Sequence, residues 1–252
     1  SSIFTSSMVQ TRLTYKSLTD SSVYTKDSGA VSPYQDVSAP LYVVAQATQT
    51  DGIGNVRATN YRYGGARRDV SLKSSVSGGW LGFRWQRQTD ETAGISTITY
   101  FNQRSDGTDG TPNLIETSTS GGQLLERKTI GWSSQSLDSG KGNKFAALAS
   151  SQTLTYDLNG VLLSCVTVSN TYNPFLPGAN FGNYGDFGLP KQTVVRTSKI
   201  CGDAASATFI KTTNTTYKHD TVNWVLGLVA KTSVLNQAPG EANVTRTSSL
   251  SY

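Results

Sequence analysis

The chain has 252 residues and a mass of 27.0 kDa, which is enough for a buried core and for one or two domains. Charged residues make up only 15% and hydrophobic residues 36%, so the composition fits neither a highly charged disordered chain nor a membrane protein. The net charge of +5 is dispersed, with its densest stretch between Arg57 and Arg68, and it does not predict nucleic-acid binding.

The residue types predict an all-β chain. There are 32 Ser, 32 Thr, 24 Gly and 12 Tyr, with a single Met. Threonine and aromatic residues favour pleated, half-buried surfaces, whereas Gly and Ser favour the turns between strands. The chain begins at Ser1 without an initiator methionine or a signal pattern, and we expect it to be a section of a longer polypeptide.

Turn signals rich in Asp, Gly and Asn divide the chain into strand pairs. Each pair consists of a run with strand-forming residues, a short turn and a returning run. In chain order, the predicted hairpins join 43–50 to 56–63, 81–89 to 95–103, 113–118 to 123–132, 152–156 to 161–169, 193–200 to 207–217, and 224–235 to 241–252.

The hairpins follow one another with little between them. Because a single hairpin must bury a face against its neighbours, this series predicts a curved, spiralling sheet; a β-sandwich is the alternative. Two stretches interrupt the rhythm. We expect 138–143 to be an exposed loop and 173–190 to be a spacer or a binding loop.

The residues offer little for catalysis or metal binding. The only histidine, His219, follows a strand, where a structural role is the ordinary explanation. Because the chain has only this histidine and two cysteines, a zinc site or a multi-histidine metal centre is not expected. No cofactor is expected either. Asp90 with Glu91, or Asp106 with Asp109, could form a glycosidase-like pair, and residues 106–110 could form a weak calcium loop. Both stretches are first of all good turns.

Cys165 lies on a strand whose alternate positions are apolar. We expect it to be a buried free thiol. A disulfide with Cys201, 36 positions further on, is the alternative that an oxidising compartment would favour.

Three blocks of sequence resemble the Rhs/YD-repeat proteins, in particular the shell-forming region of Tc insecticidal toxin B components. The first runs from Tyr61 and Tyr63 through Gly79, Leu81, Gly82 and Phe83 to Phe101. The second, Tyr156-Asp157-Leu158-Asn159-Gly160-Val161-Leu162, matches the YD element itself. The third contains Trp224 and Gly227 and ends at Tyr252.

The resemblance covers residues 41–252, with 1–40 weakly matched, and it treats 1–252 as one β region. It implies a secreted or delivered bacterial toxin complex in which this chain is a non-enzymatic wall segment of a shell. The partners it implies are the remaining shell segments, an enclosed toxic polypeptide and proteins of a delivery complex. The Pro-rich self-cleaving plug of those shells has no match here. A surface-binding β module, either an adhesin or a carbohydrate-recognition domain, and a glycosidase-like enzyme are the alternatives.

Within this interpretation the motif residues are structural. The large rings are expected to fill one side of a curved sheet, although a sugar-binding platform would use the same side chains. We expect Asp157 to accept a hydrogen bond from a backbone amide two residues on. Gly82 and Gly227 are expected to relieve crowding where the sheet bends.

Overall fold

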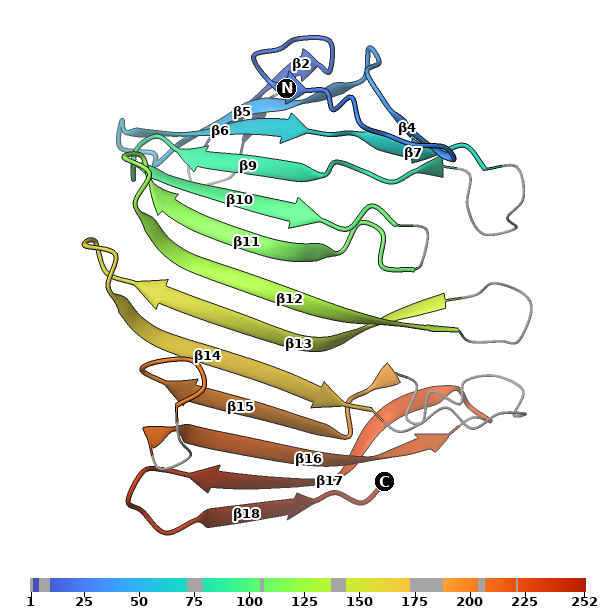
Figure 1. The fold of residues 1–252 in the computed structure, drawn as a ribbon, viewed down its shortest axis with the longest axis vertical. Coiled ribbons are helices and arrows are strands. Elements are labelled where there is room, and N and C mark those ends of the chain that lie inside the picture. Colours follow the sequence, from blue (N-terminus) through green and yellow to red (C-terminus); the bar gives the residue numbers. More distant parts are fainter. Residues whose placement is uncertain are drawn as a thin grey trace. The chain divides into compact units, whose positions relative to one another are not determined.

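The computed structural model describes residues 2–4, 10–71, 79–104, 107–136, 144–172, 188–203, 207–220 and 222–252 (Figure 1). These residues form strands and connecting turns, with no α-helix among them. In the described part of the chain, no helix is long and apolar enough to cross a membrane. The chain divides into two compact units, Ser1–Glu126 and Arg127–Tyr252, each of which is described by itself.

The first unit holds one long sheet and one small sheet. The long sheet has the order β1-β2-β5-β6-β9-β10-β11, β3 pairs in parallel with the end of β6, and the small sheet has the order β4-β7-β8. The strands are β1 (Ser2–Phe4), β2 (Gln10–Ser17), β3 (Tyr24–Thr25), β4 (Tyr34–Asp36), β5 (Tyr42–Thr50), β6 (Val56–Gly64), β7 (Arg67–Asp69), β8 (Gly79–Trp80), β9 (Trp85–Asp90), β10 (Ile95–Phe101) and β11 (Pro112–Thr119).

The second unit is a simpler meander in which the strands lie side by side in chain order (Figure 1). Its first strand begins just before the boundary between the units. The strands are β12 (Leu124–Ser136), β13 (Lys144–Tyr156), β14 (Leu162–Thr171), β15 (Gln192–Ser198), β16 (Phe209–Asp220), β17 (Val225–Gln237) and β18 (Val244–Ser249).

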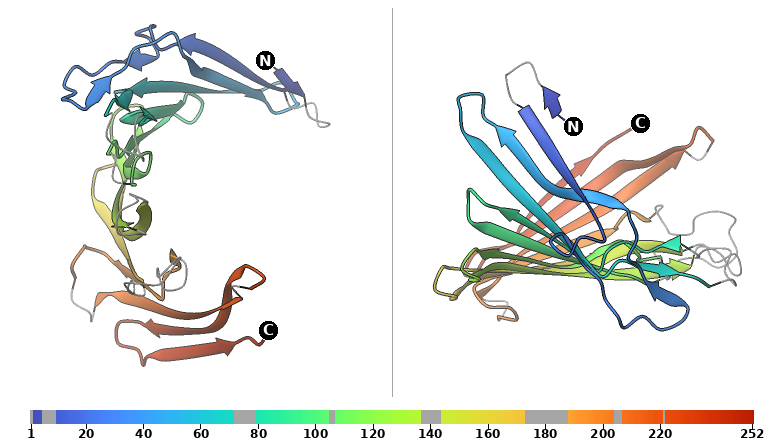
Figure 2. Two further views of the ribbon diagram at one scale, coloured as in Figure 1. Left: turned by 90° about the vertical axis from the view of Figure 1, so that its right-hand side faces the viewer. Right: turned by 90° about the horizontal axis from the view of Figure 1, so that it is seen from above.

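The predicted all-β fold of consecutive antiparallel hairpins is confirmed. Strands β5–β6, β9–β10, β13–β14, β15–β16 and β17–β18 pair antiparallel as expected. A turn closed by the Thr119 amide, which donates to the Gln123 carbonyl at 2.9 Å, joins β11 to β12. The sandwich alternative is wrong, because the long sheet of each unit runs on as one open layer (Figure 2), and the only other sheet among the described strands is the three-stranded β4-β7-β8.

A sheet without a second layer is half-buried on both faces. Every residue of β10 and β11 is partly exposed, whichever face its side chain points to. Cross-strand hydroxyl pairs occupy part of these faces, as between Thr97 and Thr117 at 3.2 Å and between Thr89 and Ser96 at 3.3 Å. Such pairs stabilise neighbouring strands without a thick apolar core, which explains the abundance of Ser and Thr.

The apolar core of the first unit is small and draws on the N-terminal residues. Leu18, Val23 and Tyr24 are buried against Tyr63 and Ala66. The small sheet beside this cluster was not expected from the sequence. Its strands are short, and they pair residues far apart in the chain, such as Tyr34 with Asp69.

The expectation of free thiols is wrong. Cys165 and Cys201 form a disulfide, with their Cα atoms 5.2 Å apart. The register explains the contact, since Cys165 lies opposite Ser198 at the end of β15 and the following turn brings Cys201 back over β14. Cys165 is 1% exposed, so the bridge is shielded on that side.

Breaking this bridge should destabilise the second unit. In the loop-closure model, a crosslink across 36 positions stabilises a fold by roughly 3–4 kcal/mol. We therefore expect reduction, or the double change Cys165→Ala and Cys201→Ala, to lower the urea midpoint markedly. Reductant should not affect the double variant, which serves as the control. A wild-type midpoint that does not move on reduction would contradict a structural bridge.

Candidate functional site

The motif residues that the sequence places near position 80 come together around the ring of Phe83. The Tyr63 ring lies 4.8 Å from it, the Trp80 ring 5.6 Å and the Tyr24 ring 6.3 Å, centroid to centroid. Leu81, which is 6% exposed, lies on the same segment. This aromatic cluster joins the end of β6 to the segment between β8 and β9, and Trp80 at its edge is 48% exposed.

Two tyrosine hydroxyls of the cluster tie strands together. Tyr24 donates to the Val37 carbonyl at 2.6 Å and accepts from the Ala66 amide at 3.0 Å, while Tyr63 donates to the Val44 carbonyl at 3.0 Å. Burial raises the pKa of both phenols above the ordinary value, which keeps them neutral donors. Tyr24 thereby fixes residues 37 and 66 to the same point; sequence reasoning missed it because it lies outside the matched blocks.

Gly82 is required by backbone conformation and not by crowding. Its φ is +80°, and a Cβ atom placed there would meet nothing within 4 Å. The crowding expected at this position is therefore wrong, although the bend is real. Strand β9 begins only at Trp85, four residues later than expected, because this left-handed residue interrupts the extended conformation between β8 and β9, over residues 81–84.

Two ion pairs fix the loop between β3 and β4. The Arg84 guanidinium donates to both carboxylate oxygens of Asp27, at 2.6 and 2.9 Å, and Arg67 lies 3.3 Å from Asp36. The hydrogen bonds from Arg84 hold the pKa of Asp27 below its ordinary value. The first pair anchors the loop to the residue just before β9, and the second joins the end of β4 to β7.

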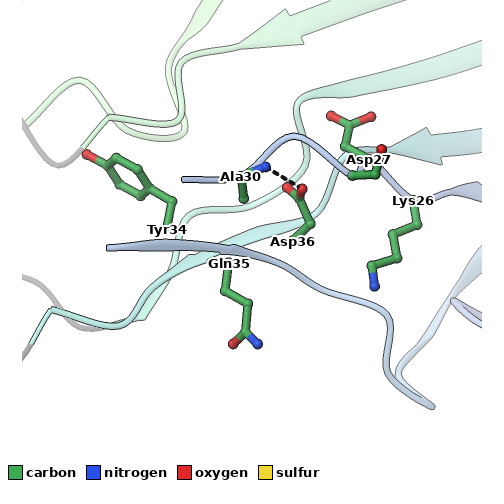
Figure 3. Close-up of a pocket in the computed structure, with 7 residues that line it drawn as sticks. Lys26, Asp27, Ala30, Tyr34, Gln35 and Asp36 are labelled. Atoms are coloured by element: carbon green, nitrogen blue, oxygen red, sulfur yellow. Dashed lines mark hydrogen bonds between the residues drawn. The ribbon is translucent and has the colours of Figure 1, made fainter. Parts of the chain in front are cut away.

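An open pocket of about 460 Å³ lies along this loop (Figure 3). Its two carboxylates are already engaged, Asp27 by Arg84 and Asp36 by Arg67 and by the Ala30 amide at 2.8 Å. Figure 3 shows the Asp36 carboxylate directed at that amide. These groups serve the loop, and the pocket gathers no set of free acid and base groups. Its lining residues are Lys26, Asp27, Ser28, Ala30, Tyr34, Gln35 and Asp36.

The YD element is a capped turn, as predicted. Asp157 accepts hydrogen bonds from the Asn159 and Val161 amides, both at 2.8 Å, and Gly160 has a φ of +82°. Tyr156 is the last residue of β13 and lies opposite Leu162. The same cap occurs at Asp51, whose carboxylate accepts from the amide of Ile53 at 2.9 Å.

The possible glycosidase pair is also engaged in a turn. Asp90 accepts from the Thr92 and Ala93 amides at 3.0 Å and pairs with Arg57, while Glu91 accepts from Asn60 at 2.6 Å. The hydrogen bond from the Ala93 amide, followed by the contact with Arg57, lowers the pKa of Asp90. A catalytic general acid needs the opposite shift.

The C-terminal motif surrounds the only histidine. His219 Nδ1 accepts a hydrogen bond from the Gly227 amide at 3.0 Å, across an irregularity in the β16–β17 pairing. Gly227 has a φ of +78°, and a Cβ atom there would lie 2.9 Å from Leu189, so both the expected crowding and a conformational requirement apply. Trp224 has a φ of 55° and is 64% exposed, and its ring is therefore not part of a filled face.

Several expectations lie outside the described residues. They are the exposed loop at 138–143, most of the stretch 173–190, and Asp106 of the weak calcium loop. Within the described part of the chain, no three His, Cys, Asp or Glu side chains are grouped as metal ligands.

Comparisons with known proteins give a likeness of fold alone. No protein-family model and no curated protein matches the sequence. Among solved structures, the chain is similar to the crystal structure of TcdB2-TccC3-Cdc42, with a TM-score of 0.60 and 13% identity over 91% of this chain. It spans 14% of the length of that matched chain. A porin-like protein from Bacteroides uniformis covers 82% of this chain and 81% of its own at 14% identity, but its TM-score of 0.26 carries no argument.

The conformation of Gly82 can be tested by substitution. Because valine at a φ of +80° is strained, Gly82→Val should lower the free energy of unfolding of the first unit by roughly 1–3 kcal/mol. Gly79→Val is the matched control, since Gly79 lies in β8 without a positive φ and with nothing within 4 Å of a Cβ. Thermal unfolding of both variants checks this, and equal midpoints would contradict a constrained bend at Gly82.

The Asp27–Arg84 pair predicts a dependence of stability on pH. A carboxyl whose folded pKa is lowered contributes stability that is complete above its unfolded pKa of about 3.9 and is lost as the pH falls through the folded value. Asp27→Asn should cost about 0.5–1 kcal/mol at neutral pH, after discounting for the exposure of Arg84. Thermal melts should show this difference closing below about pH 4; a gap that persists in acid would argue against the pair.

Proposed function

We propose that this chain is a wall segment of an Rhs/Tc-type shell that encloses a toxic polypeptide before delivery. The fold likeness to TcdB2-TccC3-Cdc42 is the observation that carries the proposal, because it extends over 91% of this chain. The chain spans only 14% of that chain, as a section of a larger wall would. Its partners would then be neighbouring shell segments, the enclosed polypeptide and proteins of a delivery complex.

The chemistry of the sheet supports a wall. A sheet that surrounds an unfolded passenger must carry side chains on both faces that tolerate partial exposure to water. It must also offer few places for the passenger to bind. Half-buried positions on both faces of β10 and β11, with hydroxyl pairs such as Thr97–Thr117, meet the first requirement. Carboxylates engaged in turns and ion pairs, such as Asp157 and Asp27, help to meet the second.

The disulfide supports the proposal that this chain works in an oxidising compartment. A bridge such as Cys165–Cys201 forms and persists in oxidising surroundings, which fits a secreted or delivered complex. We also propose that this segment has no catalysis of its own. The engagement of Asp90 and Glu91 in a turn supports that view against the glycosidase alternative.

A wall has two faces that differ in access, and this is the basis of the test. Successive residues of a strand point to opposite faces, so Ser96→Cys and Thr97→Cys place one thiol on each face of β10. Each variant is made in the complete natural polypeptide that contains this chain. The thiols are then labelled with a small maleimide and with a bulky polymer maleimide.

In a closed shell, both thiols react with the small reagent, and only one reacts with the bulky reagent. Labelling of both thiols by the bulky reagent would mean an open sheet and would refute encapsulation. The pair Thr232→Cys and Ser233→Cys on β17 repeats the test in the second unit. Glycan binding that is lost when residues 173–190 are deleted would instead favour the surface-binding alternative. Glycosidase activity lost in Asp90→Asn or Glu91→Gln would favour the enzyme.

A further inference from the structure

Two arginines lie directly opposite each other on one face of the first unit's sheet. Arg62 of β6 is the register partner of Arg87 of β9, and Arg87 in turn lies opposite Ile98 of β10. Directly opposed residues of an antiparallel pair project to the same face, with Cβ atoms about 5 Å apart. Like charges in this arrangement repel each other, so the pair needs an explanation.

Neither arginine is paired with a carboxylate among the described residues. The Arg62 guanidinium donates only a long hydrogen bond, of 3.4 Å, to the Ser21 carbonyl. The Nε atom of Arg87 is buried and has no hydrogen-bond partner. By contrast, Arg57, Arg67 and Arg84 of the same unit each contact an aspartate.

The acidic side chains on this face do not neutralise the two arginines. Glu116 lies opposite Ile98, one strand beyond Arg87. The Glu91 carboxylate, beyond the end of β9, accepts a hydrogen bond from Asn60 at 2.6 Å. The positive charge of the two guanidinium groups is therefore not neutralised locally by the described part of the protein.

The residue pairs on either side of Arg62 and Arg87, on the same face of the sheet, provide a suitable environment for an anion. On one side, Trp85 packs over Gly64 so closely that a Cβ there would overlap the indole ring, which gives an apolar wall. On the other side, the hydroxyl groups of Thr89 and Ser96 lie 3.3 Å apart, and either can donate a hydrogen bond. Two guanidinium groups between an apolar ring and hydroxyl donors match the requirements of an oxyanion.

We propose that Arg62 and Arg87 form a binding site for one oxyanionic group, either a carboxylate of an acidic polypeptide or a phosphate. The anion would separate the two like charges and would accept hydrogen bonds from the guanidinium groups of Arg62 and Arg87. This inference goes beyond encapsulation and does not depend on it, because the site would bind its ligand whether or not the sheet encloses a passenger.

Thermal unfolding of the 252-residue chain tests the site, with inorganic phosphate as the probe at constant ionic strength. The chain is compared with Arg62→Gln, Arg87→Gln and the control Arg12→Gln. The control removes the same charge from an exposed position of β2. If the dissociation constant is about 1 mM, about 30 mM phosphate should raise the wild-type midpoint by about 3–6 °C.

The control should gain as much as the wild type, whereas the two site variants should gain less than about a third of that shift. Equal shifts in all four proteins, or no shift in the wild type, would overturn the proposal. If Arg87→Gln does not fold by circular dichroism, the exposed Arg62→Gln decides the outcome alone. A triglutamate peptide, titrated in parallel, distinguishes the sources: tighter binding of the peptide indicates a carboxylate ligand, and tighter binding of phosphate indicates a phosphate group.

Discussion

The antiparallel hydrogen-bond ladder is the interaction on which the rest of this structure depends. In each unit it joins the strands of a long sheet into one layer, and the only other sheet among the described strands is the three-stranded β4-β7-β8. Side chains on both faces then remain partly in water, as throughout β10 and β11. Under this constraint, residues that pair well across strands while tolerating water are favoured, and Ser and Thr are the commonest residues that do so.

A ladder built from hairpins is only as well defined as its turns, because the turn fixes the register of the two strands that it joins. This accounts for the repeated use of aspartate. Asp51, Asp90, Asp157 and Asp220 each accept hydrogen bonds from amides two or more residues on, and each thereby closes a turn.

The sequence allowed prediction of features that depend on neighbouring residues. Features that depend on contacts between distant residues could not be predicted. The hairpins and the cap by Asp157 follow from turn residues a few positions apart. The core contact between Tyr24 and Ala66, the small sheet and the Cys165–Cys201 bridge join residues about 30 to 40 positions apart, with no periodic pattern that pairs them. The opposition of Arg62 and Arg87 depends on strand register, which composition does not reveal.

The two arginines differ from what is expected of a wall that offers few places for binding. Elsewhere in the first unit, Arg57, Arg67 and Arg84 each contact an aspartate, which offsets their charge. Opposed charges with a buried, unpartnered nitrogen destabilise a sheet, and proteins keep such local conflicts chiefly at functional sites.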